Sequence, residues 1–479
     1  MPDLVALPQA WRDAWQAAAG VQVIGITADS RQVRHGMIFA AVPGATVDGR
    51  NFIAQAVARG AAAVLAEPGT QMPPGSACAL LPDPQPRRRL ARMAALIAGP
   101  QPRVVAAVTG TNGKTSVVDF LRQIWTLAGR RAASLGTLGL IAPGHPGGGG
   151  LTTPDPVALA ATMTALSRAG VEHAAIEASS HGLDQCRLDG LTFAAGAITN
   201  LTRDHLDYHG SMEAYRTAKL RLFQVLLPPR APVVAGTALD KDSMDDLRGI
   251  ALRRRHTLMT VGAGGTHFDL AGVRALPGGQ VMTLGGAEIT LNLPGRFQAE
   301  NALMAAALAE ATGVSDPLSL LGQLAGVRGR LELAATLANG AAVYVDYAHT
   351  PDALGRAIDA LRPHAAGRLH IVFGAGGDRD AGKRPLMGQA AAAADRAIVT
   401  DDNPRSEDPA AIRTAVLAGC PGGIEIGGRE AAIAAAMSDL AAGDVLVVAG
   451  KGHEQGQTIA GVTHPFDDAA VVRRLAGGA

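Results

Sequence analysis

The chain has 479 residues, of which 48% are hydrophobic and 18% charged, and its formal net charge is +1 at pH 7. This length suggests about three domains, and the hydrophobic content is enough to form sizeable cores. The composition excludes an intrinsically disordered chain and gives no indication of nucleic acid as a partner.

Neither terminus nor interior shows a targeting or membrane segment. The N-terminal MPDLVALPQAW lacks a basic stretch followed by an apolar core, so we predict no signal peptide. No run approaches about 18 uninterrupted apolar residues, so we predict no membrane insertion. Three isolated cysteines, Cys78, Cys186 and Cys420, show no metal-binding spacing. A reducing compartment is therefore favoured, and we expect a cytoplasmic protein.

The first 99 residues alternate short apolar runs with Gly/Pro turns. They predict strands at 21–30, 36–44 and 61–67, and a helix at 51–60 that ends on Gly60. Residues 82–102 begin rich in proline and become helical. Pro100 and Pro102 then predict a linker, so 1–99 forms a smaller N-terminal α/β domain.

From Arg103 the pattern changes to strand-then-helix units. Strands are predicted at 103–110, 173–180 and 196–201, antiparallel strands within 256–293, and helices at 114–128 and 299–312. The alternation of strand and helix resumes after 326–332. Strands are predicted within 341–349, 367–377, 394–405 and 443–454, and helices at 352–361, 409–418 and 429–440. We therefore predict a three-domain α/β fold, with a central P-loop-type parallel-sheet domain (100–328) and a C-terminal Rossmann-like α/β domain (329–479).

Unusual polar residues follow the predicted strands. Ligands of open α/β sheets bind beyond the carboxyl ends of the strands, which makes these positions candidates for a site. They are Thr109, Glu177, Asn200, Asp346, Gly376, Asp401 and Lys451.

The segment TGTNGKTS (109–116) follows a strand and opens a helix, as a phosphate-binding loop does. Lys114 would meet the β- and γ-phosphates of a nucleotide, and the Thr115 hydroxyl would hold Mg²⁺. Only two residues separate Gly110 from Gly113, fewer than in the usual loop, so a plain structural turn remains an alternative.

Two acidic or histidine-rich segments suggest metal chemistry. Glu177 ends an apolar strand and is the acidic partner expected near nucleotide-bound Mg²⁺. In NLTRDHLDYHG (200–210), His205 and His209 lie among aspartates, but a HxxxH pair without a third ligand is weak support for zinc. The alternative is a polar helix start capped by Asp207 or Ser211.

Two further polar segments have competing interpretations. Thr152 and Thr153 precede Pro154 and either cap a helix or bind a ligand. TDDNPRSEDP (400–409) is, taken alone, a charged turn with solvated carboxylates, in which Asp401 and Glu407 have no predicted role. Whether Arg405 binds a ligand depends on the rest of the chain.

The ordered set of motifs resembles the Mur ligase family over nearly the whole chain. GTNGKT alone is also compatible with folylpolyglutamate synthetases. DSR (29–31), NLTRDHLDYHG and DYAHTPD narrow the resemblance to the branch that adds an amino acid to a UDP-linked muramoyl dipeptide. The motifs are TGTNGKTS, EASSHGL, NLTRDHLDYHGSMEAYRTAKLRLF, FQAENALMA, GRLE, DYAHTPDAL, FGAGGDRDAGKRP, DDNPR and GKGHE.

The resemblance implies an ATP-dependent ligase that uses Mg²⁺ and works through an acyl phosphate. The substrates it implies are UDP-MurNAc-L-Ala-D-Glu and meso-diaminopimelate, and we expect a monomer. The N-terminal domain would bind the UDP-sugar, the central domain ATP, and the C-terminal domain the amino acid.

The family's functional residues map onto matching positions. Catalytic roles are implied for Lys114, Lys219 and His205. ATP contacts are implied for Gly110, Thr111, Asn112, Gly113, Lys114, Thr115, Ser116, Asn301, Arg330, Asp346 (at the ribose) and His349. Metal binding is implied for Thr115, Glu177, His205 and Lys219, the last as a carbamate formed with CO₂. Acceptor contacts are implied for Ser30, Thr152, Thr153, Ser179, Gln185 and Arg187, and amino-acid contacts for Arg379, Asp402, Asn403, Pro404, Arg405, Gly450 and Glu454.

The DNPR motif bears on which amino acid is added. meso-Diaminopimelate carries a second ammonium–carboxylate pair, and Arg405 can hold the far carboxylate through two parallel hydrogen bonds. Relatives that add lysine differ at the arginine position, so DNPR favours meso-diaminopimelate. The alternatives are a lysine-adding ligase, a folylpolyglutamate synthetase-like ligase, a P-loop ATPase without an amino-acid pocket, and a non-catalytic nucleotide-binding protein.

Overall fold

The structure is a computed structural model that describes residues 23–44, 47–147, 151–276 and 278–477. The predicted absence of a signal peptide concerns residues 1–22, which lie outside these ranges. The chain divides into two compact units. Met1–Lys114 and Ala128–Met259 form the first, and Thr115–Leu127 and Thr260–Ala479 form the second.

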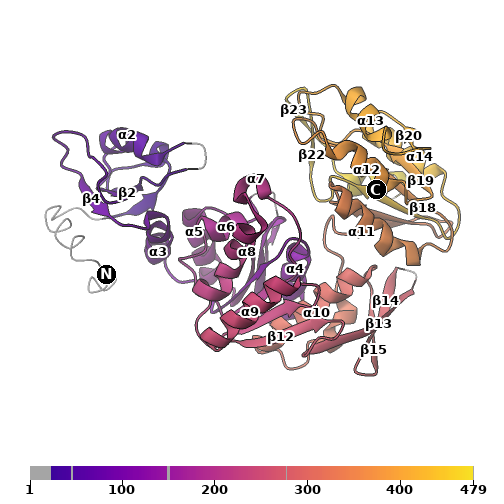
Figure 1. Ribbon diagram of the computed structural model, residues 1–479, viewed down its shortest axis with the longest axis horizontal. Helices are drawn as coiled ribbons and strands as arrows, with labels where there is room; N and C mark the ends of the chain where they lie inside the picture. The colour runs from indigo at the N-terminus through magenta and orange to yellow at the C-terminus, as the bar shows by residue number, and fades with distance from the viewer. Residues whose placement is uncertain (1–22, 45–46, 148–150, 277, 478–479) are drawn as a thin grey trace. The chain divides into compact units, whose positions relative to one another are not determined.

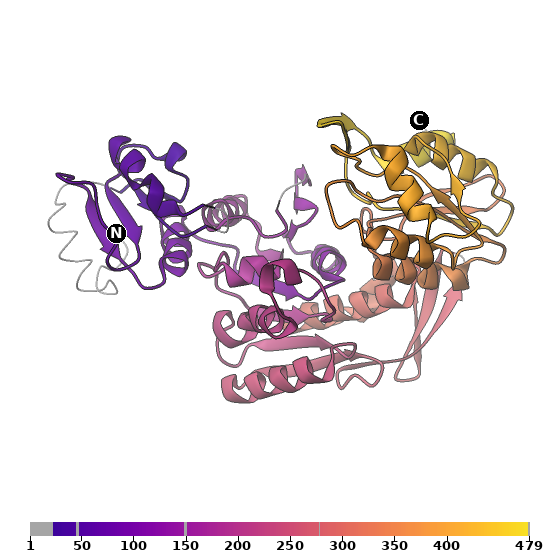
Figure 2. The same cartoon turned by 45° about the horizontal axis from the view of Figure 1, so that its top comes forward.

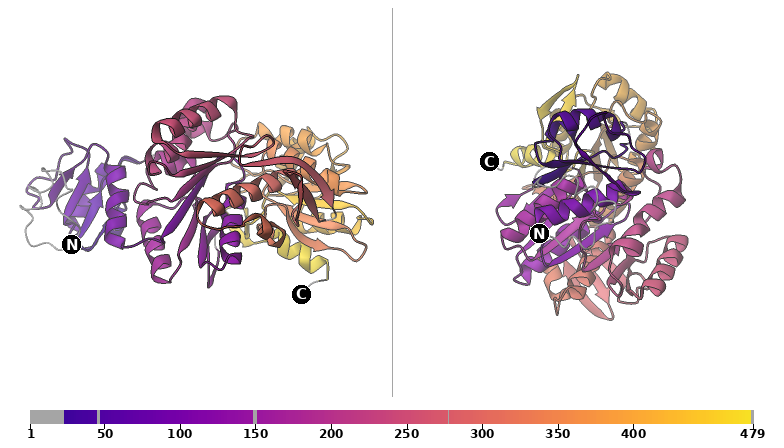
Figure 3. Two further views of the ribbon diagram at one scale, coloured as in Figure 1. Left: turned by 90° about the horizontal axis from the view of Figure 1, so that it is seen from below. Right: turned by 90° about the vertical axis from the view of Figure 1, so that its left-hand side faces the viewer.

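The first unit begins with a small sheet of four parallel strands in the order β1-β2-β3-β4 (Figures 1 and 3). Because side chains alternate along a strand, Ile38 packs toward α3 and Phe39 toward α2. Three predicted strands and both helices are confirmed, and β4 is an additional strand. The elements are β1 (Gly25–Thr27), η2 (Ser30–Gln32), β2 (Met37–Ala40), η3 (Gly49–Phe52), α2 (Ile53–Ala58), β3 (Ala63–Ala66), β4 (Ala79–Pro82) and α3 (Pro86–Ala98).

Seven strands of a larger sheet follow in the same unit, in the order β11-β10-β5-β9-β6-β7-β8, whereas α4, which comes after β5 in the chain, belongs to the second unit except for Lys114. Strands β11 to β6 of this order are parallel, and β7 and β8 are antiparallel additions. The elements are β5 (Val104–Thr109), α4 (Lys114–Leu127), β6 (Ala132–Gly136), β7 (Gly139–Ala142), β8 (His145–Pro146), α5 (Pro156–Arg168), β9 (His173–Glu177), α6 (Ser180–Asp184), β10 (Ala195–Ile198), α7 (Leu206–His209), α8 (Met212–Arg221), the π-helical η4 (Leu222–Leu226), β11 (Pro232–Gly236) and α9 (Lys241–Arg254).

Strand β5 lies between β10 and β9, and this order places the site. Val108 pairs with Glu177 of β9, and Thr109 pairs with Ile198 of β10. The phosphate-loop segment after β5 therefore emerges between Glu177 and the segment that begins at Thr199.

The second unit starts with β12 to β15 and a long helix beside them (Figure 2). β13, β14 and β15 are antiparallel, as predicted for 256–293, whereas β12 pairs in parallel with β13. The elements are β12 (Thr257–Gly262), β13 (Phe268–Leu276), β14 (Gly279–Leu284), β15 (Ala287–Leu291), α10 (Arg296–Ala311) and η5 (Leu318–Gln323).

The C-terminal part is a doubly wound sheet in the order β16-β17-β21-β18-β19-β20, parallel except for β16. Helices α11, α12 and α13 cover one face, and α14 and α15 cover the other. The elements are β16 (Glu332–Thr336), β17 (Ala342–Asp346), α11 (Pro351–Leu361), η6 (Arg362–His364), β18 (Leu369–Phe373), α12 (Lys383–Ala391), β19 (Arg396–Val399), α13 (Pro409–Leu417), β20 (Ile424–Glu425), α14 (Arg429–Ser438), β21 (Val445–Ala449), β22 (Gly456–Ile459), β23 (Val462–Pro465) and α15 (Asp468–Leu475).

The α/β class with mostly parallel sheets is confirmed. Neighbouring strands of the C-terminal sheet end in the segments that the sequence singled out. β17 ends at Asp346, β21 runs into Gly450, and β19 runs into residues 400–405. Parallel strands place their carboxyl ends along one edge, so these polar segments share that edge.

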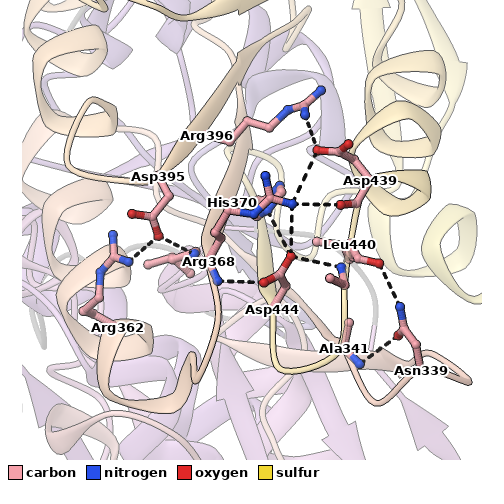
Figure 4. A network of polar contacts seen from close by, with 12 residues as sticks. Asn339, Ala341, Arg362, Arg368, His370, Asp395, Arg396, Asp439, Leu440 and Asp444 are labelled. Carbon is pink, nitrogen blue, oxygen red and sulfur yellow. Dashed lines mark hydrogen bonds and ion pairs between the residues drawn. The ribbon is translucent and has the colours of Figure 1, made fainter.

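The opposite edge of the C-terminal sheet carries a network of ion pairs (Figure 4). His370 is fully buried on β18, with Nε2 3.5 Å from the Asp444 carboxylate. Arg368 also pairs with Asp444, and Arg396 pairs with Asp439. Burial lowers the pKa of His370, and Arg368 lowers it further, against the opposing effect of Asp444. His370 is therefore neutral in the folded protein near pH 7.

Replacing His370 with leucine is expected to weaken the dependence of folding stability on acid. The pKa of the folded imidazole lies below its ordinary value of 6.5. As pH falls through about 6.5, the unfolded chain takes up a proton that the folded chain resists, so the free energy of unfolding falls. Urea unfolding of the wild type should show this loss between about pH 7.5 and 5, and the leucine variant should show less of it.

His464 provides a matched control, because it is exposed in the same part of the chain. His464→Leu should retain the wild-type pH dependence. An unchanged acid-induced loss in His370→Leu would assign that loss to other groups.

Candidate active site

The phosphate-loop segment joins β5 to α4, and its backbone requires glycine. Gly110 has φ +136°, and a Cβ there would lie 1.9 Å from Oγ1 of Thr199. The Thr199 hydroxyl donates to the Asn112 carbonyl, and the Asn200 side chain bonds Asn112 at both N–H and C=O. Thr111 contacts the hydroxyl of Tyr215 at 3.2 Å. The phosphate-loop segment is thus held by the loop that follows β10 and by Tyr215 of α8.

Two lysines converge on this segment. Nζ of Lys114 donates to the carbonyls of Gly110 and Thr111, and Nζ of Lys219 donates to the same Gly110 carbonyl at 2.7 Å. Lys219 is buried on α8, over the Tyr215 ring. Burial and then Lys114 lower the pKa of Lys219 well below its ordinary value of 10.5. Lys219 therefore loses its proton more easily than an ordinary lysine, and the sequence alone did not reveal this.

Glu177 is a buried carboxylate without a cationic partner among the described residues. Its oxygens accept from the backbone N–H and the hydroxyl of Thr137. Gly136 lies directly against it, because a Cβ there would be 2.1 Å from Oε1. Uncompensated buried charge is costly, so this carboxylate suits a cation.

His205 begins α7 in a left-handed conformation, with φ +52°. Its ring meets that of His181 edge-on at 4.9 Å, and His181 also contacts Tyr208 and His209. Burial first, and then neighbouring imidazoles, lower the pKa of His181. Ser211, one of the two predicted caps, caps α8 by accepting from Ala214 N–H.

Of the expected nucleotide contacts, several lie together in the second unit. Arg330 stacks over the Tyr347 ring at 4.8 Å, and its Nη2 lies 3.4 Å from Oγ1 of Thr115. Asn301 donates to Gln298, which in turn donates to the Arg330 carbonyl. Gln298 is thus a supporting residue that the sequence interpretation missed. Ser116 is buried on α4.

Asp346 is the last residue of β17, and His349 lies three positions after it. The two carboxylate oxygens of Asp346 accept from the backbone N–H groups of Leu331 and Ala348. Burial raises the pKa of Asp346, against the opposing effect of Arg330. His349 is exposed, and its Nδ1 lies 2.8 Å from the Tyr347 carbonyl.

The residues expected to contact the acceptor substrate form hydrogen bonds with other groups of the chain. Ser30 donates to Gln55, and Thr152 contacts Thr137. The buried Thr153 hydroxyl donates to the Glu177 carbonyl and accepts from Ser179 N–H. The Ser179 side chain caps α6.

The capping interpretation of Thr152 and Thr153 is wrong. Asp155 caps α5 instead, accepting from Val157 and Ala158 N–H, with Pro156 at the first helical position. An Asp–Pro start is a known helix signal, so TTPDP already contained this information.

Gln185 and Arg187 form a connected pair after α6. Oε1 of Gln185 accepts from Nε and Nη2 of Arg187, at 3.2 and 2.7 Å. Nη1 of Arg187 donates to the Thr153 carbonyl at 2.7 Å. Among the described residues, none of these partners is a carboxylate.

The expected amino-acid contacts lie at the carboxyl edge of the C-terminal sheet. Arg405 has φ +55°, and its Nη1 donates to the Gly377 carbonyl. Glu454 accepts from Asn403 and from the buried Lys451, both at 3.0 Å. Arg379 is exposed, and no hydrogen bond or ion pair joins it to another described residue. The sequence marks Lys451 only as a polar residue after a predicted strand and does not predict its contact with Glu454.

The expectation that the carboxylates of 400–409 are mostly solvated is wrong for three of them. Asp401 pairs with Arg413 and accepts from Gly428 N–H. Glu407 pairs with Arg384. Asp402 is buried and faces Gly450, where a Cβ would lie 2.5 Å from its Oδ2. Nearby Pro404 accepts from Glu407 N–H in a turn. The segment is a braced structure rather than a solvated turn.

A buried ion pair stabilises the carboxyl end of β21. Arg429 and Asp468 are fully buried and joined by two hydrogen bonds of 2.7 Å. Arg429 also donates to the Ala449 carbonyl, at the end of β21.

Burial and then Arg330 lower the pKa of His453 to about 4, so the imidazole beside Glu454 is neutral.

Nothing in the described ranges forms a metal site from side chains alone. No group of three or more His, Cys, Asp or Glu side chains there could hold a metal ion. Mg²⁺ bound with a nucleotide needs only one or two protein ligands, so a single buried carboxylate such as Glu177 is compatible with it. No helix in the same ranges is long and apolar enough to cross a membrane.

Family models match three segments of the chain. They are "Mur ligase family, catalytic domain" at residues 22–97, "Mur ligase middle domain" at 108–309, and "Mur ligase, glutamate ligase domain" at 329–452.

Curated and solved relatives agree with these matches. The chain is 52% identical over 461 residues to UDP-N-acetylmuramoyl-L-alanyl-D-glutamate–2,6-diaminopimelate ligase of Caulobacter vibrioides, with 94% of each chain covered. It is 49% identical to the Rhizobium meliloti protein of that name, with 96% of each covered. A solved ligase of that name has a TM-score of 0.71 and 34% identity, with 95% of each chain covered. MurF ligase from Thermotoga maritima, at 17% identity and a TM-score of 0.61, covers 95% of this chain and 97% of its own and shares the fold. The chain therefore belongs to the Mur ligase family.

Proposed function

We propose that the protein is an ATP-dependent ligase that joins meso-diaminopimelate to the D-glutamate of UDP-MurNAc-L-Ala-D-Glu, in the synthesis of peptidoglycan precursors. The observation that carries the proposal is the strand order β10-β5-β9, which brings the phosphate loop, the buried Glu177 and Thr199 together. The names of the relatives support the choice of substrates.

The reaction must bring two anions together. The D-glutamate carboxylate attacks the γ-phosphorus of ATP, ADP leaves, and an acyl phosphate forms. The amine of the amino acid then attacks the acyl carbon, and phosphate leaves the tetrahedral intermediate. Lys114, now on the Gly110 carbonyl, would offset the phosphate charge. Mg²⁺ would add positive charge at the phosphates, held by Thr115, Glu177 and His205.

We propose that the lowered pKa of Lys219 allows this lysine to form a carbamate with CO₂. Only an unprotonated amine attacks CO₂: the new N–C bond gives a carbamate anion, and one proton is released to water. Burial and Lys114 both favour the unprotonated form. The resulting anion would be a metal ligand, which an ammonium is not.

Selection of the amino acid is assigned to Arg405 and Glu454. Arg405 forms no ion pair within the described residues, so it can take the distal carboxylate of meso-diaminopimelate. Glu454, held by Lys451 and Asn403, would take the distal ammonium. Asp402, Pro404 and Gly450 shape this edge, and Arg379 would close onto the ligand from its exposed loop.

Three domains would divide this work. We propose boundaries at 1–99, 100–328 and 329–479 for the UDP-sugar, ATP and amino-acid domains. Asn301, Arg330, Asp346 and His349 would contact ATP, and Ser30, Thr152, Thr153, Ser179, Gln185 and Arg187 the acceptor. A cytoplasmic monomer remains our expectation.

A phosphate-release assay tests the proposal. The purified protein should release phosphate from ATP with UDP-MurNAc-L-Ala-D-Glu and meso-diaminopimelate, and much more slowly with L-lysine or L-ornithine. Equal release without the acceptor would indicate an uncoupled ATPase. Release with a folate and L-glutamate instead would indicate a folylpolyglutamate synthetase.

Arg405→Ala is expected to reduce kcat/KM with meso-diaminopimelate by about 10²–10³-fold, because the distal carboxylate loses its charged partner. Activity with L-lysine, which lacks that carboxylate, should change far less. Arg356→Ala, on the exposed surface of α11, is the control and should leave both substrates unaffected. Equal losses with both amino acids would remove Arg405 from selection.

A further inference from the structure

Tyr208 lies between two side chains of the preceding segment. Its hydroxyl donates to Oδ2 of Asp184 at 2.8 Å, and Nε2 of Gln185 donates to the same hydroxyl at 3.0 Å. Tyr208 belongs to α7, whereas Asp184 and Gln185 end α6. The hydroxyl therefore connects two short helices that the backbone does not join directly.

The chemistry of the partners fixes the direction of each bond. An ionised Asp184 can only accept, so the single proton of the Tyr208 hydroxyl is directed to it. The hydroxyl oxygen must then accept, and Gln185 must present its NH₂ group. The amide oxygen of Gln185 consequently faces Arg187, which can only donate. Burial raises the pKa of Tyr208, which keeps the phenol protonated.

The chain of bonds ends on the Arg187 guanidinium, whose hydrogen-bond partners are all uncharged; burial lowers the pKa of Arg187, and the Asp155 carboxylate only partly opposes this. Arg187 is half-buried, and its bonds go to the amide oxygen of Gln185 and the Thr153 carbonyl. Both acceptors are neutral, so they orient the guanidinium without cancelling its charge. A half-buried cation oriented in this way suits an anionic group of a ligand.

Ring contacts hold Tyr208 in place independently of its hydroxyl. Its ring lies 4.2 Å from that of His181 and 4.8 Å from that of His209, centroid to centroid. Removing only the oxygen therefore leaves the packing intact.

We propose that Tyr208 is a positioning residue, which fixes the Gln185 amide so that Arg187 faces an anionic group of the acceptor substrate. This inference rests on the proposed function, because it takes the UDP-linked dipeptide as the anion that Arg187 meets. Without the hydroxyl, the NH₂ group of Gln185 loses its acceptor, so the amide is held only by its bonds from Arg187 and the guanidinium is less firmly oriented.

Tyr208→Phe tests the inference. Loss of one hydrogen bond of this kind corresponds to about a tenfold change in an equilibrium constant. Titration calorimetry without ATP should show about a tenfold weaker Kd for UDP-MurNAc-L-Ala-D-Glu. In the assay, KM for the acceptor should rise by a similar factor, while kcat and the KM values for ATP and the amino acid stay within about twofold.

A double-mutant cycle makes the test specific. In a Gln185→Leu background, Tyr208→Phe should cause no further loss of affinity for the acceptor nucleotide, because the amide that links Tyr208 to Arg187 is already absent. Additive losses would overturn the inference. Tyr344→Phe is the matched control, since Tyr344 is a buried tyrosine of the C-terminal sheet and should leave every constant unchanged.

Two outcomes separate this inference from the proposed function. If the wild type does not bind the acceptor nucleotide, the proposed function fails. If the wild type binds it and Tyr208→Phe binds equally well, only the inference fails. If Tyr208→Phe lowers the Tm substantially, Asp184→Ala is the alternative variant, because it removes the carboxylate to which the Tyr208 hydroxyl donates. This variant is expected to weaken binding of UDP-MurNAc-L-Ala-D-Glu selectively.

Discussion

Replacing Lys114 with alanine is expected to reduce ligation by about 10³-fold or more, because a single preorganised charge at a transferring phosphoryl group has effects of this size. The structure adds that Lys114 bonds carbonyls of its own loop. The loss should therefore be accompanied by weaker ATP binding. Phosphate release with all three substrates measures the first effect, and titration of the protein with a non-hydrolysable ATP analogue measures the second.

Lys241→Ala is the matched control, since Lys241 is an exposed lysine paired with Asp245 on α9. It should retain wild-type activity. A Lys114→Ala variant that keeps a tenth or more of the wild-type rate would refute the role of Lys114 at the phosphates.

Lys219→Ala is expected to be nearly inactive, with a loss comparable to that of Lys114→Ala, because the proposed carbamate, and with it a proposed metal ligand, cannot form. A short carboxylic acid such as acetate or propionate should partly restore activity, since it can supply the missing carboxylate in the space that alanine leaves. Rate measurements over a range of acid concentrations test this.

Lys219→Arg serves as the contrasting variant, because a guanidinium is always positively charged, cannot form the carbamate and fills the space. It should be inactive and should not respond to the added acid. Intact-mass analysis in bicarbonate provides a direct measurement of CO₂ on the wild type. An active enzyme whose Lys219 carries no CO₂ would contradict the carbamate.

Much of the fold was predictable because it is encoded locally. The apolar run before Gly110 predicted β5, and GKT predicted the start of α4. β4 was missed because its four residues lie between Gly/Pro-rich turns and carry little periodic signal. The parallel pairing of β12 and β13 depends on how a turn folds back, which a β-rich composition does not determine.

The site was predictable where a motif carries it and unpredictable where distant residues cooperate. Gln298 and Arg330 are 32 positions apart, and Gln185 and Tyr208 are 23 apart, so no local pattern joins them. The pairing of Asp401 with Arg413 was missed for a related reason. Within its own segment Asp401 has no cationic partner, and only the folding of α13 brings Arg413 to it.

The ion-pair network and the segments that we propose select the amino acid lie at opposite ends of the strands of the C-terminal sheet, and this affects how the protein can change. The ion-pair network around His370 and Asp444 lies at the amino ends of the strands, whereas Arg405 and Glu454 follow their carboxyl ends. Loop substitutions that alter the preferred amino acid therefore leave the network at the other edge untouched. Such a domain can acquire a new substrate preference in single steps without first accumulating stabilising substitutions.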